Sequence, residues 1–119
     1  MIYSKFTLLF TFALVGCGNL NELRDRPADR TILVNGKYDS IAKCVAGEAD
    51  KISESVGLPT LRFNEVERTA NLFRLHPDMS PVYDIKFIQL NLQTVRVEGR
   101  RIAFLERLWP AIEKCSTPK

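Results

Sequence analysis

The side chains with the most reactive chemistry in this 119-residue sequence are three cysteines, at positions 17, 44 and 115, and one histidine, His76. No two of the cysteines have the Cys-x-x-Cys spacing of a thiol redox catalyst. A metal site in a protein takes three or four ligands. Because His76 has no second histidine to join it, we expect no bound metal.

Other catalytic patterns are equally sparse. A Ser-His-acid triad would need His76 beside a serine on a nucleophile elbow, and the sequence has no such motif. Pairs of acids, Glu65 with Glu67 or Asp78 with Asp84, have the chemistry of a glycosidase, but a chain this short has little room for a sugar cleft. There is no glycine-rich phosphate loop. We therefore expect a protein that is not an enzyme and has no cofactor.

The surroundings of Cys17 are more informative. Lys5 precedes an apolar run of 11 residues from Phe6 to Gly16, which ends directly before the cysteine. A helix that spans a bilayer needs about 20 residues, whereas the apolar region of a signal peptide has about 7 to 15. The run ends in Leu14-Val15-Gly16-Cys17, which resembles the lipobox of bacterial lipoproteins. The alternatives are an ordinary secretory signal cut near Cys17, or an N-terminal core element with an incidental cysteine.

The resemblance implies that residues 1–16 are a signal peptide that is removed. Cys17 then becomes the first residue and carries a diacylglyceryl thioether, with a further acyl chain such as palmitate on its amine. Two or more acyl chains give persistent membrane attachment. Gly18, and not an aspartate, follows the cysteine. In enterobacterial members of the family an aspartate there favours the inner membrane, so we expect the outer membrane, facing the periplasm.

Length and charge set further limits. Removal of 16 of the 119 residues would leave 103, enough for one small domain. The chain has 17 basic and 14 acidic residues, and Arg100-Arg101 is its one adjacent basic pair. Such dispersed charge does not predict nucleic-acid binding. If Cys17 is lipidated, Cys44 and Cys115 remain as an even pair in an exported protein, which predicts a disulfide. The alternative is two buried free thiols.

The chain after Cys17 divides into a tether and a domain. Residues 17–31 are polar and predict a lipidated cysteine followed by a flexible tether, although Leu20 and Leu23 have the spacing of one helical turn. The domain then covers residues 32–119. Its first segment, residues 32–34, predicts a short edge strand or a lead-in to a helix. Apolar residues at three- and four-residue steps predict that helix over about 40–56, with Cys44 on its buried face.

Alternating residues next predict about four strands, over 61–64, 70–75, 83–90 and 94–98, with a turn at 91–93 before the last strand. A change of phase predicts a β-bulge near Phe87-Ile88, or a strand buried on both faces. Pro110 interrupts the last apolar stripe, so we expect a turn or helix over 101–108 and a second helix over 110–114, or else one kinked helix. The fold class is thus α+β, in the order α-β-β-β-β-α. An antiparallel sheet would have the N-terminal and C-terminal helices on one face, which brings the two cysteines within reach.

This layout is similar to that of small proteobacterial lipoproteins with paired cysteines. We expect a membrane-anchored, non-enzymatic module that binds or assembles with an envelope protein. The alternative is an inhibitor of a secreted enzyme such as lysozyme, acting through the loop 76–81. The candidate partner-binding residues are three arginines expected on the solvent face of the sheet, Arg62, Arg74 and Arg96, together with Trp109. Arg100 and Arg101 could extend the same basic strip. Trp109 would either line a groove or pack in the core. Solvated charges paired across strands are the other explanation for the arginines.

Overall fold

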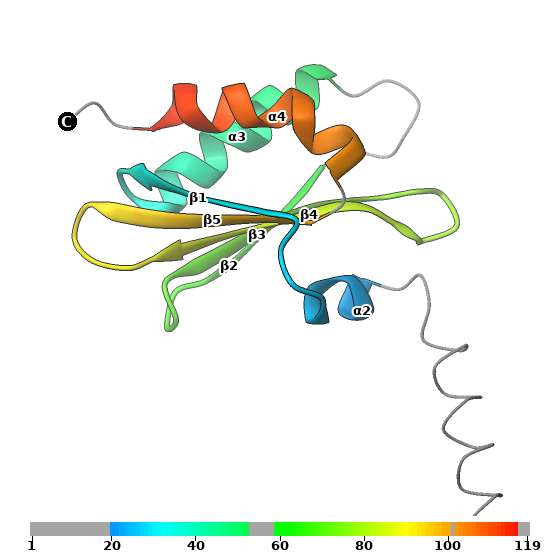
Figure 1. The fold of residues 1–119 in the computed structure, drawn as a ribbon, viewed down its shortest axis with the longest axis horizontal. Helices are drawn as coiled ribbons and strands as arrows, with labels where there is room; N and C mark the ends of the chain where they lie inside the picture. Colours follow the sequence, from blue (N-terminus) through cyan, green and yellow to red (C-terminus); the bar gives the residue numbers. More distant parts are fainter. Residues whose placement is uncertain (1–19, 53–58, 101, 117–119) are drawn as a thin grey trace, which may run out of the picture.

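The computed structural model describes residues 20–52, 59–100 and 102–116, and in these the chain forms one antiparallel five-stranded sheet with helices on both faces (Figure 1). In chain order the elements are α2 (Leu20–Asp25), β1 (Arg30–Asn35), α3 (Tyr38–Ile52), β2 (Thr60–Asn64), β3 (Thr69–Leu75), β4 (Pro81–Gln89), β5 (Thr94–Arg100) and α4 (Ile102–Cys115). The strand order is β1-β5-β4-β3-β2. Helices α3 and α4 lie on one face of the sheet and α2 lies on the other.

The predicted α+β class with an antiparallel sheet is confirmed, but the prediction of about four strands is corrected to five. The additional strand is β1, which pairs with β5 so that Val34 faces Val95 and Ile32 faces Val97. Val34 is buried and Ile32 packs against the core. The apolar triplet at 32–34 therefore forms an edge strand because two of its three side chains extend the core.

Helix α3 follows from its apolar stripe. Ile41, Val45 and Ala49 recur every four residues, and each is at most 1% exposed. The first turn is closed by the Ile41 amide, which donates to the Lys37 carbonyl at 3.0 Å. The Asp39 carboxylate accepts from the Ser40 amide at 2.9 Å, as expected of a short acidic side chain at a helix start. The predicted end of this helix, near residue 56, lies outside the described residues.

Strands β3, β4 and β5 form the centre of the core, because alternate side chains of each strand point toward α3 and α4. The predicted β-bulge at Phe87-Ile88 is wrong, since both residues pair in regular register with β3 and β5. The register shift lies instead between Arg74 and Leu75. Phe87 is fully buried on the helix side and Ile88 is half-buried on the other side. The apparent change of phase thus reflects a strand with apolar side chains on both faces.

Helix α4 continues through Pro110 as one helix, so the prediction of two separate segments is wrong. A proline inside a helix removes one backbone hydrogen bond and costs about 3 kcal/mol. The exposed Pro110 ring lies away from the core, whereas Leu108, Trp109 and Ile112 on either side of it are buried. Burial of these three side chains, worth about 1.5–3 kcal/mol for each large apolar group, offsets the loss.

Candidate functional site

The sheet face opposite α3 and α4 is the candidate binding surface, because among the described elements only α2 packs on it. We call it the open face. The strand registers place one row of polar side chains across its middle and a second, partly apolar row beside it. From β1 to β2, the polar row is Thr31, Glu98, Lys86, Asn71 and Arg62. The second row, in the same direction, is Leu33, Arg96, Ile88, Thr69 and Asn64. These two rows define the open face.

Two of the predicted arginines lie on the open face. Arg62 is exposed on β2. The Arg96 guanidinium lies 3.0 Å from the Glu98 carboxylate, and Arg100 approaches the same carboxylate at 3.6 Å. Charges are therefore paired along the inner strand β5, and Arg62 lies on the edge strand β2. The open face thus presents both signs of charge to a partner.

Arg74 is placed differently from the expectation. It is 2% exposed and lies on the opposite face of the sheet, where its Nη2 atom donates to the Ala49 carbonyl at 3.4 Å. Its guanidinium carbon is 6.0 Å from the centre of the Tyr83 ring. Successive side chains of a strand point to opposite faces of the sheet. Arg74 is two and four residues after the buried Leu72 and Ala70, so it points to the same face as they do. The prediction that Arg74 is exposed is therefore corrected: it ties β3 to α3.

Trp109 is also buried, at 3% exposure, and belongs to the hydrophobic core. The guanidinium of Arg30, from β1, lies 4.7 Å from the centre of its ring. Of the two roles considered for Trp109, core packing is the one that the structure shows. The cation–π contact fixes the start of the edge strand against α4.

The contact between α2 and the sheet was missed from the sequence. Arg24 lies 3.2 Å from the Asp84 carboxylate and 5.2 Å from the centre of the Phe73 ring. Asn71 donates to the same carboxylate at 3.3 Å, and Leu23 is 3% exposed. Residues 20–31, predicted as tether, thus contain a helix docked on the sheet and the first residues of β1. Residues 17–19 lie outside the described part.

Burial shifts the pKa of Asp84 upward. It is fully buried under α2, and this loss of solvation raises its pKa above the ordinary value of 3.8, with Arg24, Asn71 and Arg100 acting in the opposite direction. The folded state therefore binds the proton more tightly than the unfolded state does. The stability that follows is present below the unfolded pKa and is lost as pH rises through the folded pKa.

We expect the replacement Asp84→Asn to remove this pH-dependent loss of stability, because asparagine does not titrate. As pH rises above about 4, urea unfolding should show a smaller fall in stability for the variant than for the wild type. Asp78→Asn is the matched control, because hydrogen bonds from Ser80 lower the pKa of the exposed Asp78. The contribution of Asp78 is lost only as pH falls below its ordinary pKa of 3.8. Above about pH 4 the control should therefore follow the wild type, and the two should diverge only at lower pH. Superimposable profiles for Asp84→Asn and the wild type would contradict the assignment.

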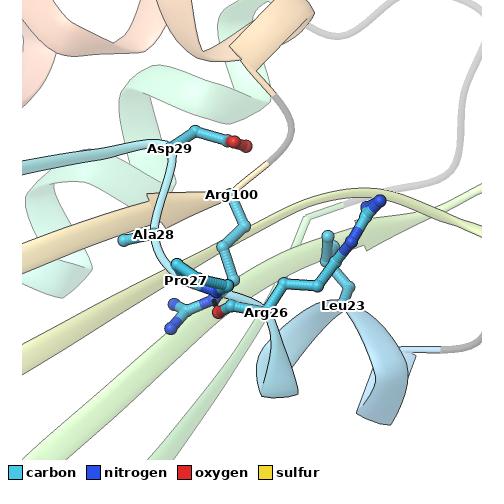
Figure 2. A pocket seen from close by; sticks show the side chains of 6 residues that line it. All are labelled: Leu23, Arg26, Pro27, Ala28, Asp29 and Arg100. Atoms are coloured by element: carbon cyan, nitrogen blue, oxygen red, sulfur yellow. Dashed lines mark hydrogen bonds between the residues drawn. The ribbon is translucent and has the colours of Figure 1, made fainter.

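A pocket of about 330 Å³ lies where the connection from α2 to β1 passes the end of β5. Its walls include Leu23, Pro27 and Asp29, together with two arginines (Figure 2). Nε of Arg100 donates to the Arg26 carbonyl at 2.8 Å, and Figure 2 shows the Arg26 side chain extending away from the Arg100 guanidinium. The two cations do not converge on one point, so the pocket does not form a two-arginine anion site.

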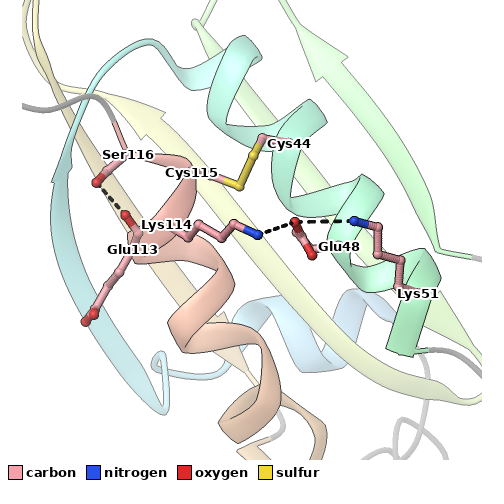
Figure 3. The surroundings of a disulfide bond; sticks show 7 residues. All are labelled: Cys44, Glu48, Lys51, Glu113, Lys114, Cys115 and Ser116. Atoms are coloured by element: carbon pink, nitrogen blue, oxygen red, sulfur yellow. Dashed lines mark hydrogen bonds and ion pairs between the residues drawn. A yellow bond between two sulfur atoms is a disulfide. The ribbon is translucent and has the colours of Figure 1, made fainter.

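The predicted disulfide between Cys44 and Cys115 is confirmed (Figure 3). It joins α3 to the end of α4, with the two Cα atoms 5.8 Å apart. Cys44 is exposed, so its predicted place on the buried face of the helix is wrong. One turn along α3, Glu48 lies 3.3 Å from Lys114 and 3.7 Å from Lys51. The disulfide therefore runs from an exposed position on α3 to the half-buried Cys115, which packs against the core.

The remaining candidate groups are dispersed. The His76 amide donates to the Ser80 carbonyl, and Asp78 accepts from the amide and hydroxyl of Ser80, which closes the β3–β4 turn. Glu65 and Glu67 are exposed in the β2–β3 turn.

Within residues 20–52, 59–100 and 102–116 no three His, Cys, Asp or Glu side chains gather to hold a metal. No helix in these ranges has the length and apolar character to span a membrane.

Comparisons of the chain with protein-family models, with curated proteins and with solved structures found no match.

Proposed function

We propose that this protein is an envelope lipoprotein, held in the membrane by a diacylglyceryl group on Cys17. The observation that carries the proposal is the sequence Leu14-Val15-Gly16-Cys17 after a short apolar run. Residues 1–16 act as the signal peptide, and the mature chain begins at Cys17. With Gly18 in the next position, the outer membrane is the favoured location, with the domain in the periplasm.

The folded part acts as a non-enzymatic binding or assembly module, and the open face is its contact surface. One face of the sheet is covered by α3 and α4, which are joined to each other by the disulfide. The other face presents Arg62, Lys86 and Leu33, the last of which is 63% exposed. Mixed charge around exposed apolar groups is the composition of a polar, reversible protein interface.

The position of α2 brings this surface close to the lipid. Gly18 and Asn19 alone separate Cys17 from the start of α2 at Leu20. A fully extended chain advances at most about 3.6 Å per residue, so the anchor lies within roughly 11 Å of α2. Because α2 lies on the open face, that face is on the membrane side of the domain. Its partner is accordingly an envelope protein at the membrane surface.

Site-specific photocrosslinking in intact membranes tests this assignment. A photoreactive amino acid replaces Arg62 or Lys86 on the open face, and Asp50 on the exposed side of α3 serves as the matched control. We expect the two open-face positions to give one discrete adduct with a different envelope protein, and the control position to give none. Adducts from Asp50 alone, or none from either open-face position, would refute the open face as the binding surface.

A further inference from the structure

The two edges of the sheet, β1 and β2, differ in how they resist pairing with another strand. Edge strands of soluble proteins are usually protected by charges or prolines. The edge strand β2 has Arg62 at its centre and Pro59 directly before it. The edge strand β1 has the uncharged run Thr31 to Val34, and Leu33 within that run is 63% exposed. Of these two edges, β1 is the one without protection.

The hydrogen-bond phase of β1 defines which backbone groups line that edge. The Gly36 amide donates to the Gln93 carbonyl at 2.7 Å, in line with the register that pairs Val34 with Val95. In an antiparallel ladder alternate residues bond to the neighbouring strand. The even-numbered residues of β1 therefore bond to β5. The backbone N–H and C=O groups of Thr31 and Leu33 point outward along the edge.

We propose that β1 pairs antiparallel with β1 of a second copy of this chain, about a two-fold axis at Leu33. The outward phase of the odd residues makes Leu33 with its counterpart a hydrogen-bonded pair. Ile32 then lies opposite Val34 of the second copy, so apolar side chains meet on both faces of the joined sheet. Beyond the strand ends lie Asp29, whose amide donates to the Gly99 carbonyl at 2.8 Å, and Lys37, whose ammonium donates to the Leu92 carbonyl at 2.7 Å.

This register brings no like charges together. Arg30, the charged residue of β1, lies opposite Gly36 of the second copy, and its guanidinium is already held over Trp109. Beyond each end of the paired strands, Asp29 of one copy and Lys37 of the other carry opposite charges, so the ends do not repel each other. Opposite-charge and apolar cross-strand pairs each contribute about 0.2–1 kcal/mol, and like charges directly opposite are unfavourable. The strand is thus complementary to itself in apolar character, and its charges do not oppose the pairing.

The two-fold symmetry also agrees with attachment of both copies to one membrane. This agreement rests on the proposed function, whereas the strand pairing itself is independent of it. A two-fold axis normal to the joined sheet keeps α2 of both copies on the same side. Both anchors at Cys17 then extend toward one bilayer. Two copies held in one membrane have a high effective concentration, which favours an interface as small as one pair of strands.

Disulfide crosslinking at the proposed axis is the direct test. The full chain carrying Leu33→Cys, in native membranes with a mild oxidant, should give a covalent dimer of this chain. Met79→Cys is the matched control, since Met79 is 67% exposed but lies in the β3–β4 turn. The control and the parent chain should remain monomeric on a non-reducing gel. Equal crosslinking of Leu33→Cys and Met79→Cys, or crosslinking of Leu33→Cys to another protein only, overturns the proposal.

A second variant tests the interface without an added thiol. Leu33→Lys should weaken the dimer of the purified full chain in detergent by about tenfold, measured by sedimentation, which corresponds to about 1.4 kcal/mol. Met79→Lys, at a position that is 67% exposed in the distant β3–β4 turn, should leave the dimer unchanged. Equal dissociation constants for the two variants, or a wild-type chain that is monomeric, refute the pairing. A chain with Cys17→Ser should still pair, which separates this result from failure of the lipid anchor.

Discussion

Replacement of Cys44 and Cys115 by alanine is expected to lower the free energy of unfolding by about 4 kcal/mol. The two cysteines are 71 positions apart, and a crosslink that closes so long a loop removes much of the conformational freedom of the unfolded chain. A domain of this size has a net stability of about 5–15 kcal/mol. The loss is therefore a large share of the total, and urea unfolding of the wild type and the double variant measures it.

Two controls make this result specific. Addition of reductant should lower the stability of the wild type to that of the double variant, and should leave the variant unchanged. Lys114→Ala removes the exposed ion pair with Glu48 beside the disulfide, and exposed ion pairs contribute little, so its unfolding midpoint should stay close to that of the wild type. A double variant as stable as the wild type would contradict the role assigned to the bond.

The second large effect is expected at Cys17. The variant Cys17→Ser should no longer incorporate a labelled fatty acid, and it should leave the membrane fraction that contains the wild-type protein. The physical reason is the acyl chains, since each buried CH₂ contributes about 0.8 kcal/mol and two or more chains make attachment persistent. Cell fractionation with metabolic labelling measures both quantities.

The double variant at Cys44 and Cys115 is the matched control for this experiment. It loses two cysteines but keeps Cys17, so it should incorporate fatty acid and remain in the membrane fraction. Undiminished labelling of Cys17→Ser would show that the acyl group is attached elsewhere.

Local patterns in the sequence predicted the elements whose own residues decide their structure. The apolar stripe of Ile41, Val45 and Ala49 predicted α3, and alternation in β4 and β5 predicted the central strands. Counting cysteines, after assignment of Cys17 to lipid, predicted the disulfide that is present. In each case one periodic signal extends over enough residues to outweigh its alternatives.

The features that were missed depend on contacts distant in the sequence. Helix α2 has six residues, too few to be stable alone, and it is stabilised on the sheet by Leu23 and by the contact of Arg24 with Asp84. Nothing near Arg24 in the sequence indicates that partner. Arg74 is a different case. Its spacing of two residues from Leu72 in the sequence indicated the buried face, but its charge led to the prediction that it is exposed to solvent. Its placement depends on a carbonyl acceptor in α3.

The intact mass of the protein extracted from its native membrane tests the central claim most directly. We predict a chain that begins at Cys17 and carries the added mass of a diacylglyceryl group, with or without a further acyl chain. Fragmentation should assign that added mass to the first residue. A chain that still begins at Met1, or one that contains Cys17 without a lipid, would contradict it.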